Sequence, residues 1–422
     1  MMRSRPSRFG WVLVLVLVLW AALVPVAQAQ EPRYRYVSVD QLELPPGFDF
    51  FSSAAINNSG RVYGTAVSCT PDFVSCYFKP AVYANGTLTV SSIPQSGFVG
   101  SANEGGTMGG SVEIDPLNFF FQAALFRGNS VELIPFQQGE IFSDVIALND
   151  SGMALVSSFD ADFINQTLVL YQNGRTTPLN FGPTVTNPFF LHLNNQGIIS
   201  GTTFVSGAGF RGFRFDTRTG QTTLLDPLST DPHAWALDIN NRGDTLGYSF
   251  VFGAIERIGV WDRNGVFQPY FVEGTQQFPT ISNELRFNDN NQIVITDVSS
   301  PASEQGNSYL VPKPGVRLNL ADLVENLPDG AKLNRINDIN NFGDMIGFGF
   351  QGEFLLQRTN LAGSAFSAPH RLFPGLESGR QAARAAFAAK LSRQIAPRSQ
   401  PLKSDGGALP PSSIGDLLMR RR

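Results

Sequence analysis

The stretch Ile56-Asn-Asn-Ser-Gly60 decides the fold, because six further copies of its pattern follow along the chain. The copies are Ala102-Asn-Glu-Gly-Gly106, Leu148-Asn-Asp-Ser-Gly152, Leu193-Asn-Asn-Gln-Gly197, Ile239-Asn-Asn-Arg-Gly243, Phe287-Asn-Asp-Asn-Asn291 and Ile339-Asn-Asn-Phe-Gly343. Their first Asn residues stand at 57, 103, 149, 194, 240, 288 and 340, at intervals of 46, 46, 45, 46, 48 and 52 residues. Self-similarity at a near-constant period indicates a repeat architecture.

Each repeat unit has the same plan. An apolar strand runs into Asn-x-x-Gly, in which Asn begins a turn and Gly supplies a positive φ at its end. A second strand follows, then a loop of variable length and an aliphatic-aromatic third strand. A second tight turn, such as Asn85-Gly86, leads to the fourth strand. We therefore assign structural turn roles to Asn57, Gly60, Asn149, Gly152, Asn194, Gly197, Asn240, Gly243, Asn340 and Gly343.

Four strands in about 45 residues are typical of one blade of a β-propeller. The sequence predicts an all-β fold, a seven-bladed β-propeller of four-stranded antiparallel blades over residues 30–358. The seventh unit lacks a clear fourth strand, whereas the segment Tyr36–Leu44 reads as a fourth strand without a unit of its own. We expect this N-terminal strand to complete the last blade, because closing the ring removes two exposed sheet edges.

The repeat resembles a known family. The pattern apolar-Asn-x-x-Gly-x-apolar-apolar-Gly, then Ala/Gly-apolar-apolar-aromatic, then Asn-Gly, is similar to the HAF family of extracellular repeat proteins over about residues 50–357. This resemblance implies an exported protein of β-propeller-like repeats and brings no established activity. The His-Ala-Phe tripeptide that names the family is absent, since the third strands read Lys79-Pro80-Ala81, Gln122-Ala123-Ala124 and Arg211-Gly212-Phe213.

The N-terminus has the pattern of an export signal. Three Arg residues precede the uncharged run Trp11–Val24, and Ala27-Gln28-Ala29 follows as a small-x-small cleavage site. We predict a signal peptide over 1–29 with cleavage after Ala29, so that the mature protein is secreted or periplasmic and has no transmembrane segment. The alternative is an uncleaved anchor, but the apolar run is shorter than the ~20 residues needed to cross a bilayer.

Two cysteines stand close together. Cys69 and Cys76 are the only two in the chain. In an oxidising compartment we expect them to form a local disulfide. Two Cys without a nearby His cannot fill a tetrahedral metal shell, so no metal site is predicted. No phosphate loop or dinucleotide fingerprint is present, and no cofactor is expected.

Charge divides the chain into an acidic body and a basic tail. Residues 31–358 carry 18 Lys and Arg against 32 Asp and Glu, whereas residues 359–422 carry ten against three. Nucleic-acid binding is not expected of an acidic body. The Ala/Pro-rich tail 359–422 is predicted to be disordered or partly helical, with Phe387, Leu391 and Ile395 on one stripe. It either tethers the protein to an anionic surface, folds back on the acidic body, or remains a loose tail.

The two ends of the blades differ in their connections. The Asn-x-x-Gly and Asn-Gly turns fall on one face of a propeller, and the longer loops fall on the other. Binding sites usually occupy such long loops on a rigid scaffold. Candidate partners are a polysaccharide, a cell-envelope component or a protein. The candidate ligand-binding residues are Phe73, Phe119, Phe120, Phe163, Phe190, His233 and Trp235. The alternative is that these Phe residues fill the gaps between blades.

Catalysis has weaker support in the sequence. Of the three His residues, His192 reads as a packing residue, His370 lies in the tail, and His233 is the plausible functional one. No Gly-x-Ser-x-Gly elbow marks a nucleophile. The leading interpretation is a non-catalytic binding or structural module. The alternative is a glycan-degrading hydrolase or lyase that uses the loop acids Glu113, Asp115, Asp160 and Asp162, unless these are solvated loop residues.

Overall fold

The computed structural model describes residues 31–39, 44–70, 76–115, 120–136, 139–160, 165–252, 255–273, 285–297, 307–349 and 351–359. The expected signal peptide over 1–29 and the tail beyond 359 lie outside the described residues. Within the described part, the secondary structure is almost entirely β. One short helix is found there, α2 (Leu320–Leu323), and no helix in that part is long and apolar enough to span a membrane.

Most of the chain is arranged as four-stranded antiparallel sheets in which strands follow one another in sequence order. Three of these sheets are β2(Phe50–Ile56) to β5(Thr87–Val90), β14(Phe189–Leu193) to β17(Gln221–Leu225), and β18(His233–Ile239) to β21(Phe267–Glu273). Their middle strands are β3(Val62–Cys69), β4(Cys76–Ala84), β15(Ile198–Val205), β16(Gly209–Asp216), β19(Thr245–Val251) and β20(Ile255–Trp261). A fourth sheet consists of β22(Leu285–Phe287), β23(Ile293–Asp297), β24(Asn307–Lys313) and β25(Val316–Asn319).

The units around anchors 103 and 149 are joined into one eight-stranded sheet. One half contains β6(Gly97–Ala102), β7(Met108–Asp115), β8(Phe120–Arg127) and β9(Ser130–Leu133). The other half contains β10(Glu140–Leu148), β11(Ala154–Asp160), β12(Gln166–Gln172) and β13(Arg175–Pro178). A single parallel pair, Phe142 with Phe121, connects the halves. The pairing therefore gives six sheets in the described residues, where the sequence predicts seven separate blades.

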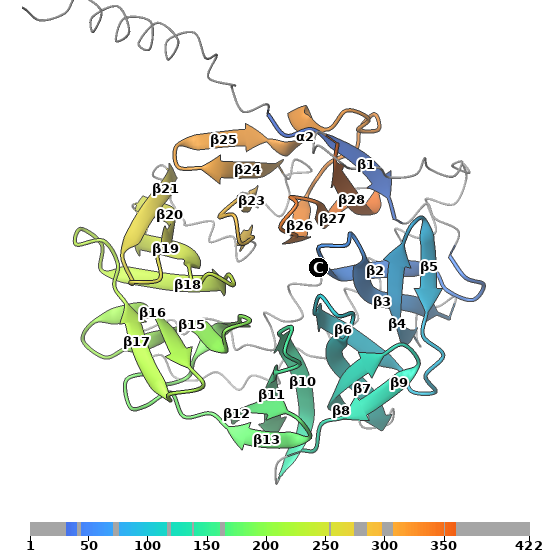
Figure 1. Ribbon diagram of the computed structural model, residues 1–422, viewed down its shortest axis with the longest axis horizontal. Coiled ribbons are helices and arrows are strands. Elements are labelled where there is room, and N and C mark those ends of the chain that lie inside the picture. The colour runs from blue at the N-terminus through green and yellow to red at the C-terminus, as the bar shows by residue number, and fades with distance from the viewer. Residues whose placement is uncertain are drawn as a thin grey trace, which may run out of the picture.

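The strand that precedes the first repeat completes the sheet of the last one. This sheet has the order β1(Tyr34–Ser38), β28(Gly352–Arg358), β27(Met345–Gly349) and β26(Arg335–Ile339). Tyr34 pairs with Arg358 and Ser38 pairs with Phe354, in antiparallel register. The N-terminal strand is thus confirmed in the expected sheet, although it spans Tyr34–Ser38 where the sequence predicts Tyr36–Leu44. Figure 1 shows the sheets around a common axis, with β1 at the outer edge of the last sheet, next to β28. This arrangement is a β-propeller.

The repeat pattern contains a second Gly, four residues after the turn Gly, and the shape of the first strand of each unit explains it. This first strand is the innermost one of its sheet. Six of these strands carry a register shift a few residues before the Asn turn. Such bulges bend a strand locally. In four units the neighbouring strand has Gly close to the bent backbone. A Cβ on Gly247 would lie 1.8 Å from the carbonyl oxygen of Trp235, and one on Gly64 would lie 2.0 Å from that of Ser52. Glycine is required there because the two backbones approach so closely.

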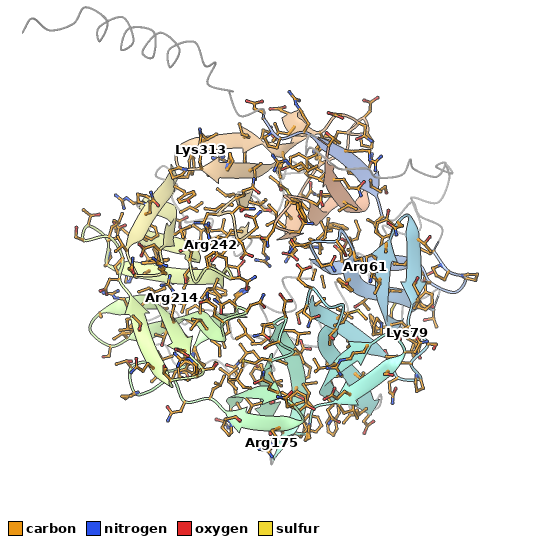
Figure 2. The ribbon with its side chains drawn as sticks, in the orientation of Figure 1. Arg61, Lys79, Arg175, Arg214, Arg242 and Lys313 are labelled. Atoms are coloured by element: carbon orange, nitrogen blue, oxygen red, sulfur yellow. A yellow bond between two sulfur atoms is a disulfide. The ribbon has the colours of Figure 1, made fainter. Side chains whose placement is uncertain are left out.

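The hydrophobic core lies between neighbouring sheets. The largest cluster joins Phe190 of β14 to Trp235 of β18, Leu285 of β22 and Val311 of β24. Another joins Tyr34 of β1 to core residues of the last two sheets. Side chains fill the spaces between the sheets, and Figure 2 shows Arg61 and Arg242 nearer the ring axis than Arg175 and Lys313. Because each sheet is buried by its neighbours, the core depends on the whole ring.

Candidate functional site

The repeated Asn turns satisfy their own backbone through the anchor side chain. The Oδ1 of Asn57 accepts hydrogen bonds from the backbone N–H groups of Ser59 and Arg61, and Gly60 has a φ of +75°. The same two bonds recur at five further anchors, where Oδ1 accepts from the backbone N–H groups two and four positions later: Asn149, Asn194, Asn240, Asn288 and Asn340. In the degenerate copy, Asn291 takes the place of Gly with a φ of +56°.

The anchor side chains also connect the units to one another. The Nδ2 of Asn103 donates to the carbonyl oxygen of Asn149, and the pattern continues through the later anchors until Asn340 donates to Asn57. Asn57 reaches the carbonyl of Glu104, one residue beyond the next anchor. These seven bonds measure 2.9–3.4 Å. We call this closed circle the anchor ring: Asn57, Asn103, Asn149, Asn194, Asn240, Asn288 and Asn340.

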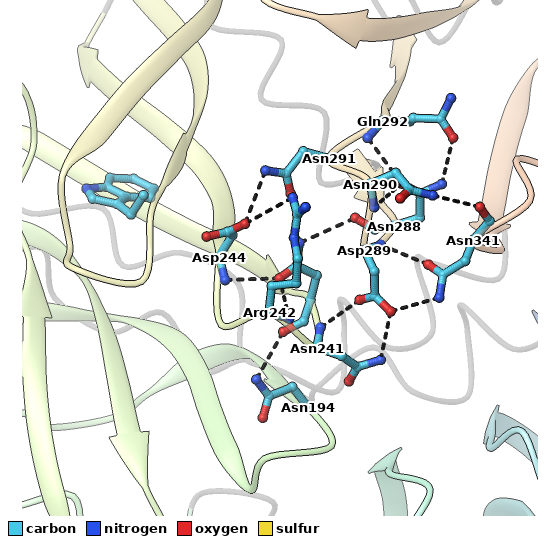
Figure 3. Close-up of polar contacts among 12 residues, drawn as sticks. Asn194, Asn241, Arg242, Asp244, Asn288, Asp289, Asn290, Asn291, Gln292 and Asn341 are labelled. Atoms are coloured by element: carbon cyan, nitrogen blue, oxygen red, sulfur yellow. Dashed lines mark hydrogen bonds and ion pairs between the residues drawn. The ribbon is translucent and has the colours of Figure 1, made fainter.

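The residues that follow the anchors form a second closed circle. The backbone N–H of each donates to the side chain of the equivalent residue in the next turn, over 2.7–3.1 Å. Figure 3 shows one part of it, where Asp289 accepts from Asn241 and from the Nδ2 of Asn341. This second ring consists of Asn58, Glu104, Asp150, Asn195, Asn241, Asp289 and Asn341. Sequence reasoning treated the anchors as turn formers and did not predict either ring.

A third set of contacts involves the residues two positions before the anchors. His192 Nδ1 lies 3.2 Å from the Asp238 carboxylate, although the sequence favoured a packing role for this His. Arg286 Nε donates to the carbonyl of Asn337, and Asp338 accepts the backbone N–H of Ile56. The sequence contains a signal for these contacts, since titratable residues occupy this position in four consecutive units. These contacts join neighbouring units, so we assign them to the scaffold.

The opposite end of the strands carries an aromatic cluster. It consists of Phe189, Phe190, Phe204, Phe210, His233, Trp235, Phe250 and Phe252, and we call it the Trp235 cluster. Its members lie where β14, β16 and β18 begin and where β15 and β19 end or have just ended. The ring centroid of Trp235 lies 5.6 Å from that of Phe190, 5.8 Å from Phe210 and 5.3 Å from Phe250. These separations are typical of favourable edge-to-face aromatic packing.

The Trp235 cluster has a buried base and an exposed top. Phe190, Trp235 and Phe250 are buried. In contrast, Phe204 is 52% exposed and Phe252 is 49% exposed. Phe210 lies between them, with ring centroids 5.4 Å from Phe204 and 6.0 Å from Phe252. The scaffold therefore holds two exposed aromatic rings in fixed positions.

His233 is fixed as an uncharged aromatic member of this cluster. Its Nδ1 accepts the backbone N–H of Phe210 at 3.3 Å, which leaves the proton of the neutral ring on Nε2. Burial, together with the nearby Arg211, lowers its pKa below the usual value. A Cβ on Gly209 would lie 2.5 Å from this Nδ1, so glycine is required beside the ring. The geometry favours packing and orientation over proton transfer.

Two further features mark the base of the cluster. Phe190 has a φ of +54°, a backbone conformation that is strained for a bulky residue and persists only where its surroundings impose it. The Nε1–H of Trp235 is buried and finds no acceptor among the described residues. A buried donor without a partner is costly, and it is available to an acceptor on a ligand or a water molecule.

The connection that leads into β18 is fixed by a buried ion pair. Asp231 accepts from Arg257 at 2.5 Å and from the hydroxyl of Ser249 at 2.6 Å. Its side chain is almost completely buried, so loss of Arg257 would leave an unpaired charge in the interior. The same connection places Asp226 in solvent, with 85% of its side chain exposed. Arg211 Nε lies 3.7 Å from the Asp226 carboxylate.

The other candidate ligand-binding residues are placed differently. Phe120 begins β8 and is partly buried, while Phe73, Phe119 and Phe163 lie outside the described residues. A row of Phe rings runs through the first three units, with centroids 4.1–6.4 Å apart: Phe78, Phe98, Phe121, Phe142 and Phe159. These rings pack between strands of the first three units, and none of them is among the seven candidates. The structure thus brings together three of the seven candidates, Phe190, His233 and Trp235.

The candidate catalytic acids are only partly described. Glu113 and Asp115 end β7, and burial followed by the charge of Asp115 raises the pKa of Glu113 above its usual range. Asp160 ends β11 and accepts from Asn165 Nδ2 at 2.5 Å. Asp162 lies outside the described residues. Of the four candidate acids, the structure therefore shows an electrostatic interaction between Glu113 and Asp115.

The two cysteines form a disulfide between β3 and β4, at directly paired positions. This confirms the predicted bond. Among the described residues, no three His, Cys, Asp or Glu side chains are grouped so that they could hold a metal ion.

No known family model and no curated protein matches this chain. Solved structures are similar at low identity. TolB from Acinetobacter baumannii is 14% identical over 66% of this chain and 72% of its own, with a TM-score of 0.35. YCF48 from Cyanidioschyzon merolae is 9% identical over 77% and 98%, with a TM-score of 0.43. The acylaminoacyl peptidase of Pyrococcus horikoshii is 11% identical over 74% and 50%, with a TM-score of 0.44. At these values, none of the similarities bears on ligand or activity.

Proposed function

We propose that this protein is an exported, non-catalytic binding module whose recognition site is the Trp235 cluster. The observation that carries the proposal is the pair Phe204 and Phe252, two half-exposed rings held on a buried aromatic base. Aromatic side chains provide a large contact area at a low cost in conformational entropy, and they are enriched among the residues that dominate binding energy. Apolar groups of a partner are the complementary chemistry.

The strain and the unpaired donor support the same location. Phe190 is held in an unfavourable backbone conformation at the base of the site, and Trp235 has an Nε1–H without an acceptor in the described part. Features of this kind collect at functional sites, where the rest of the fold compensates for their cost.

The number of blades, the export of the protein and its family are also part of this proposal. We take the eight-stranded sheet as two blades in contact through one pair of residues, which gives seven blades. The seven turns of the anchor ring and its closure from Asn340 to Asn57 support this count. Export rests on the signal pattern of residues 1–29, and the Cys69–Cys76 disulfide is consistent with an oxidising compartment. Assignment to the HAF family rests on the repeat pattern.

The test is binding of the mature chain, residues 30–422, to arrays of polysaccharides and of defined peptides. We expect saturable binding that weakens about tenfold or more in the double variant Phe204→Ser, Phe252→Ser, because buried aromatic contacts at an interface commonly contribute more than about 1.4 kcal/mol. The matched control is Val266→Ser with Phe342→Ser, which removes two exposed apolar side chains at the short turns. Binding that is equal in both variants, or absent throughout, would refute the proposal.

One observation favours a second function. Glu113 has a raised pKa beside the carboxylate of Asp115, and a general acid of a glycan-degrading enzyme needs such a shift. If the protein cleaves glycans, Glu113→Gln should reduce turnover at least about 100-fold without weakening substrate binding. The matched control is Glu140→Gln, at the start of β10. Turnover that survives Glu113→Gln would exclude this role.

A further inference from the structure

His233 links the two exposed rings of the Trp235 cluster. Its ring centroid lies 4.8 Å from that of Phe252, and its Nδ1 accepts the backbone N–H of Phe210. The ring of Phe210 in turn has its centroid 5.4 Å from that of Phe204 and 6.0 Å from that of Phe252. His233 therefore contacts one exposed ring directly and anchors the residue that lies between both.

The hydrogen bond to Phe210 exists only while Nδ1 is unprotonated. A charged imidazole carries a proton on both nitrogens and can accept no hydrogen bond. After protonation, the new N–H of His233 would face the N–H of Phe210, and two donors would oppose each other. The space beside the ring is filled up to the backbone of Gly209, where an added Cβ would lie 2.5 Å from Nδ1. A positive charge on His233 must therefore displace its ring, Phe210 or both.

The surroundings of His233 oppose such a charge. Charged groups approach it from three segments of the described chain: Arg211 on β16, Asp226 and Asp231 in the connection into β18, and Glu256 and Arg257 on β20. Asp231 is paired with Arg257. Phe250 of β19 pairs with both His233 and Glu256 and so stands between them. Burial and the positive charge of Arg211 lower the pKa of His233 below its usual range.

We infer that the Trp235 cluster is a pH-responsive binding site, in which protonation of His233 separates Phe210 from Phe252 and releases the bound partner. The inference deepens the proposed function, on which it rests, because it adds regulation to the same site. The sign follows from the neutral ring. The assembled cluster is fully present above the ordinary His pKa of about 6.5 and is lost as pH falls below that value.

The first part of the experiment follows Trp235 itself and needs no ligand. Of the four Trp residues, Trp11 and Trp20 precede residue 30, so 5-fluorotryptophan gives the mature chain 30–422 two ¹⁹F resonances, from Trp235 and Trp261. We expect the Trp235 resonance to shift reversibly between pH 7.5 and pH 5, with a midpoint below about 6.5. Trp261 packs on Phe267 and is the internal control, whose resonance should stay constant.

Two variants assign this transition to His233. His233→Asn keeps an oxygen that can accept the N–H of Phe210 but does not titrate, so the Trp235 resonance should become independent of pH. The matched control is His370→Asn, which should titrate like the wild type. Arg211→Gln removes the charge that opposes protonation, so the midpoint should move to higher pH. A transition that persists in His233→Asn, that is absent from the wild type, or that has a midpoint above about 6.5 would overturn the inference.

Binding separates this inference from the proposed function. A polysaccharide or peptide that binds on the arrays should bind at least about fivefold more weakly at pH 5 than at pH 7.5, and equally at both in His233→Asn. If binding requires Phe204 and Phe252 but does not change with pH, the inference alone fails. If Trp235 titrates through His233 but nothing on the arrays binds, the proposed function fails and the pH-dependent assembly of the cluster stands.

Discussion

At the residue scale, the anchor Asn must donate and accept at once. Asn194 accepts from its own turn through Oδ1 and donates through Nδ2 to the carbonyl of Asn240. Asp at this buried position would keep the acceptor but set a carboxylate against a carbonyl oxygen. We expect Asn194→Asp to reduce the free energy of unfolding by about 2–4 kcal/mol in urea denaturation.

The chain contains a natural control for this change. Asp262 occupies an outer turn, where its Oδ1 accepts from the backbone N–H groups of Asn264 and Val266 and the described part of the chain shows no further unit for it to reach. Asp262→Asn should leave the unfolding midpoint unchanged. Equal effects of Asn194→Asp and Asp262→Asn would mean that the ring contact contributes nothing to stability.

Asp238 and Asp338 occupy the same repeat position, but their contributions to folding stability should change with pH in opposite directions. Burial raises the pKa of Asp338 to about 6, so its ionised form is unfavourable in the folded state, and its contribution to stability falls as pH rises from about 4 to 6. Burial also acts on Asp238, but His192 and further partners outweigh it and lower that pKa, so its contribution is present above about pH 4 and is lost as pH falls further.

Stability measured against pH in two Asn variants checks these signs. Relative to the wild type, Asp338→Asn should gain about 2 kcal/mol between pH 4 and pH 7, since one pKa unit corresponds to about 1.4 kcal/mol and partial exposure reduces the full effect. Asp238→Asn should lose stability relative to the wild type as pH rises from about 3 to 5. Parallel curves for the two variants would contradict the assignment of their environments.

At the element scale, the innermost strand and its neighbour are adapted to each other. The bulge in β18 brings the carbonyl of Trp235 against Gly247 in β19. We expect Gly247→Ala to cost about 3 kcal/mol, because a methyl group cannot enter without moving the backbone. In Gly220→Ala, a matched turn position with open space and a φ of +71°, the cost should be about 1 kcal/mol from backbone strain alone. Thermal unfolding distinguishes these outcomes.

Turns and strands could be predicted from the sequence where residues close together in the chain are enough to specify them. Asn57 and Gly60 specify a turn by themselves, and Asn85-Gly86 specifies a hairpin, with φ of +51° and +84° in the structure. Phe204 and Phe252 were not predicted as site residues, because each reads as an ordinary residue at the end of a strand. Only the pairing register and the ring bring them to Trp235 and His233, which lie in another part of the repeat.

At the scale of the whole molecule, the ring closes between the last and first units through two separate devices. One is the pairing of β1 with β28, and the other is the pair of bonds from Asn340 to Asn57 and from Asn341 to Asn58. Within β1, the N–H of Tyr36 faces away toward Asn326, so that of the adjacent Val37 faces β28. Val37→Pro should therefore weaken the strand pairing by about 3 kcal/mol.

If both devices hold one junction, their losses should not be additive. Once Val37→Pro has loosened the junction, Asn340→Ala removes a contact that is already weakened, so the double variant should be less destabilised than the sum by about 0.5–2 kcal/mol. Asn149→Ala makes the matched change at a distant junction and should be additive with Val37→Pro within about 0.5 kcal/mol. Additivity in both pairs would mean that the strand and the anchor ring stabilise the propeller independently, and that the ring does not close as a unit.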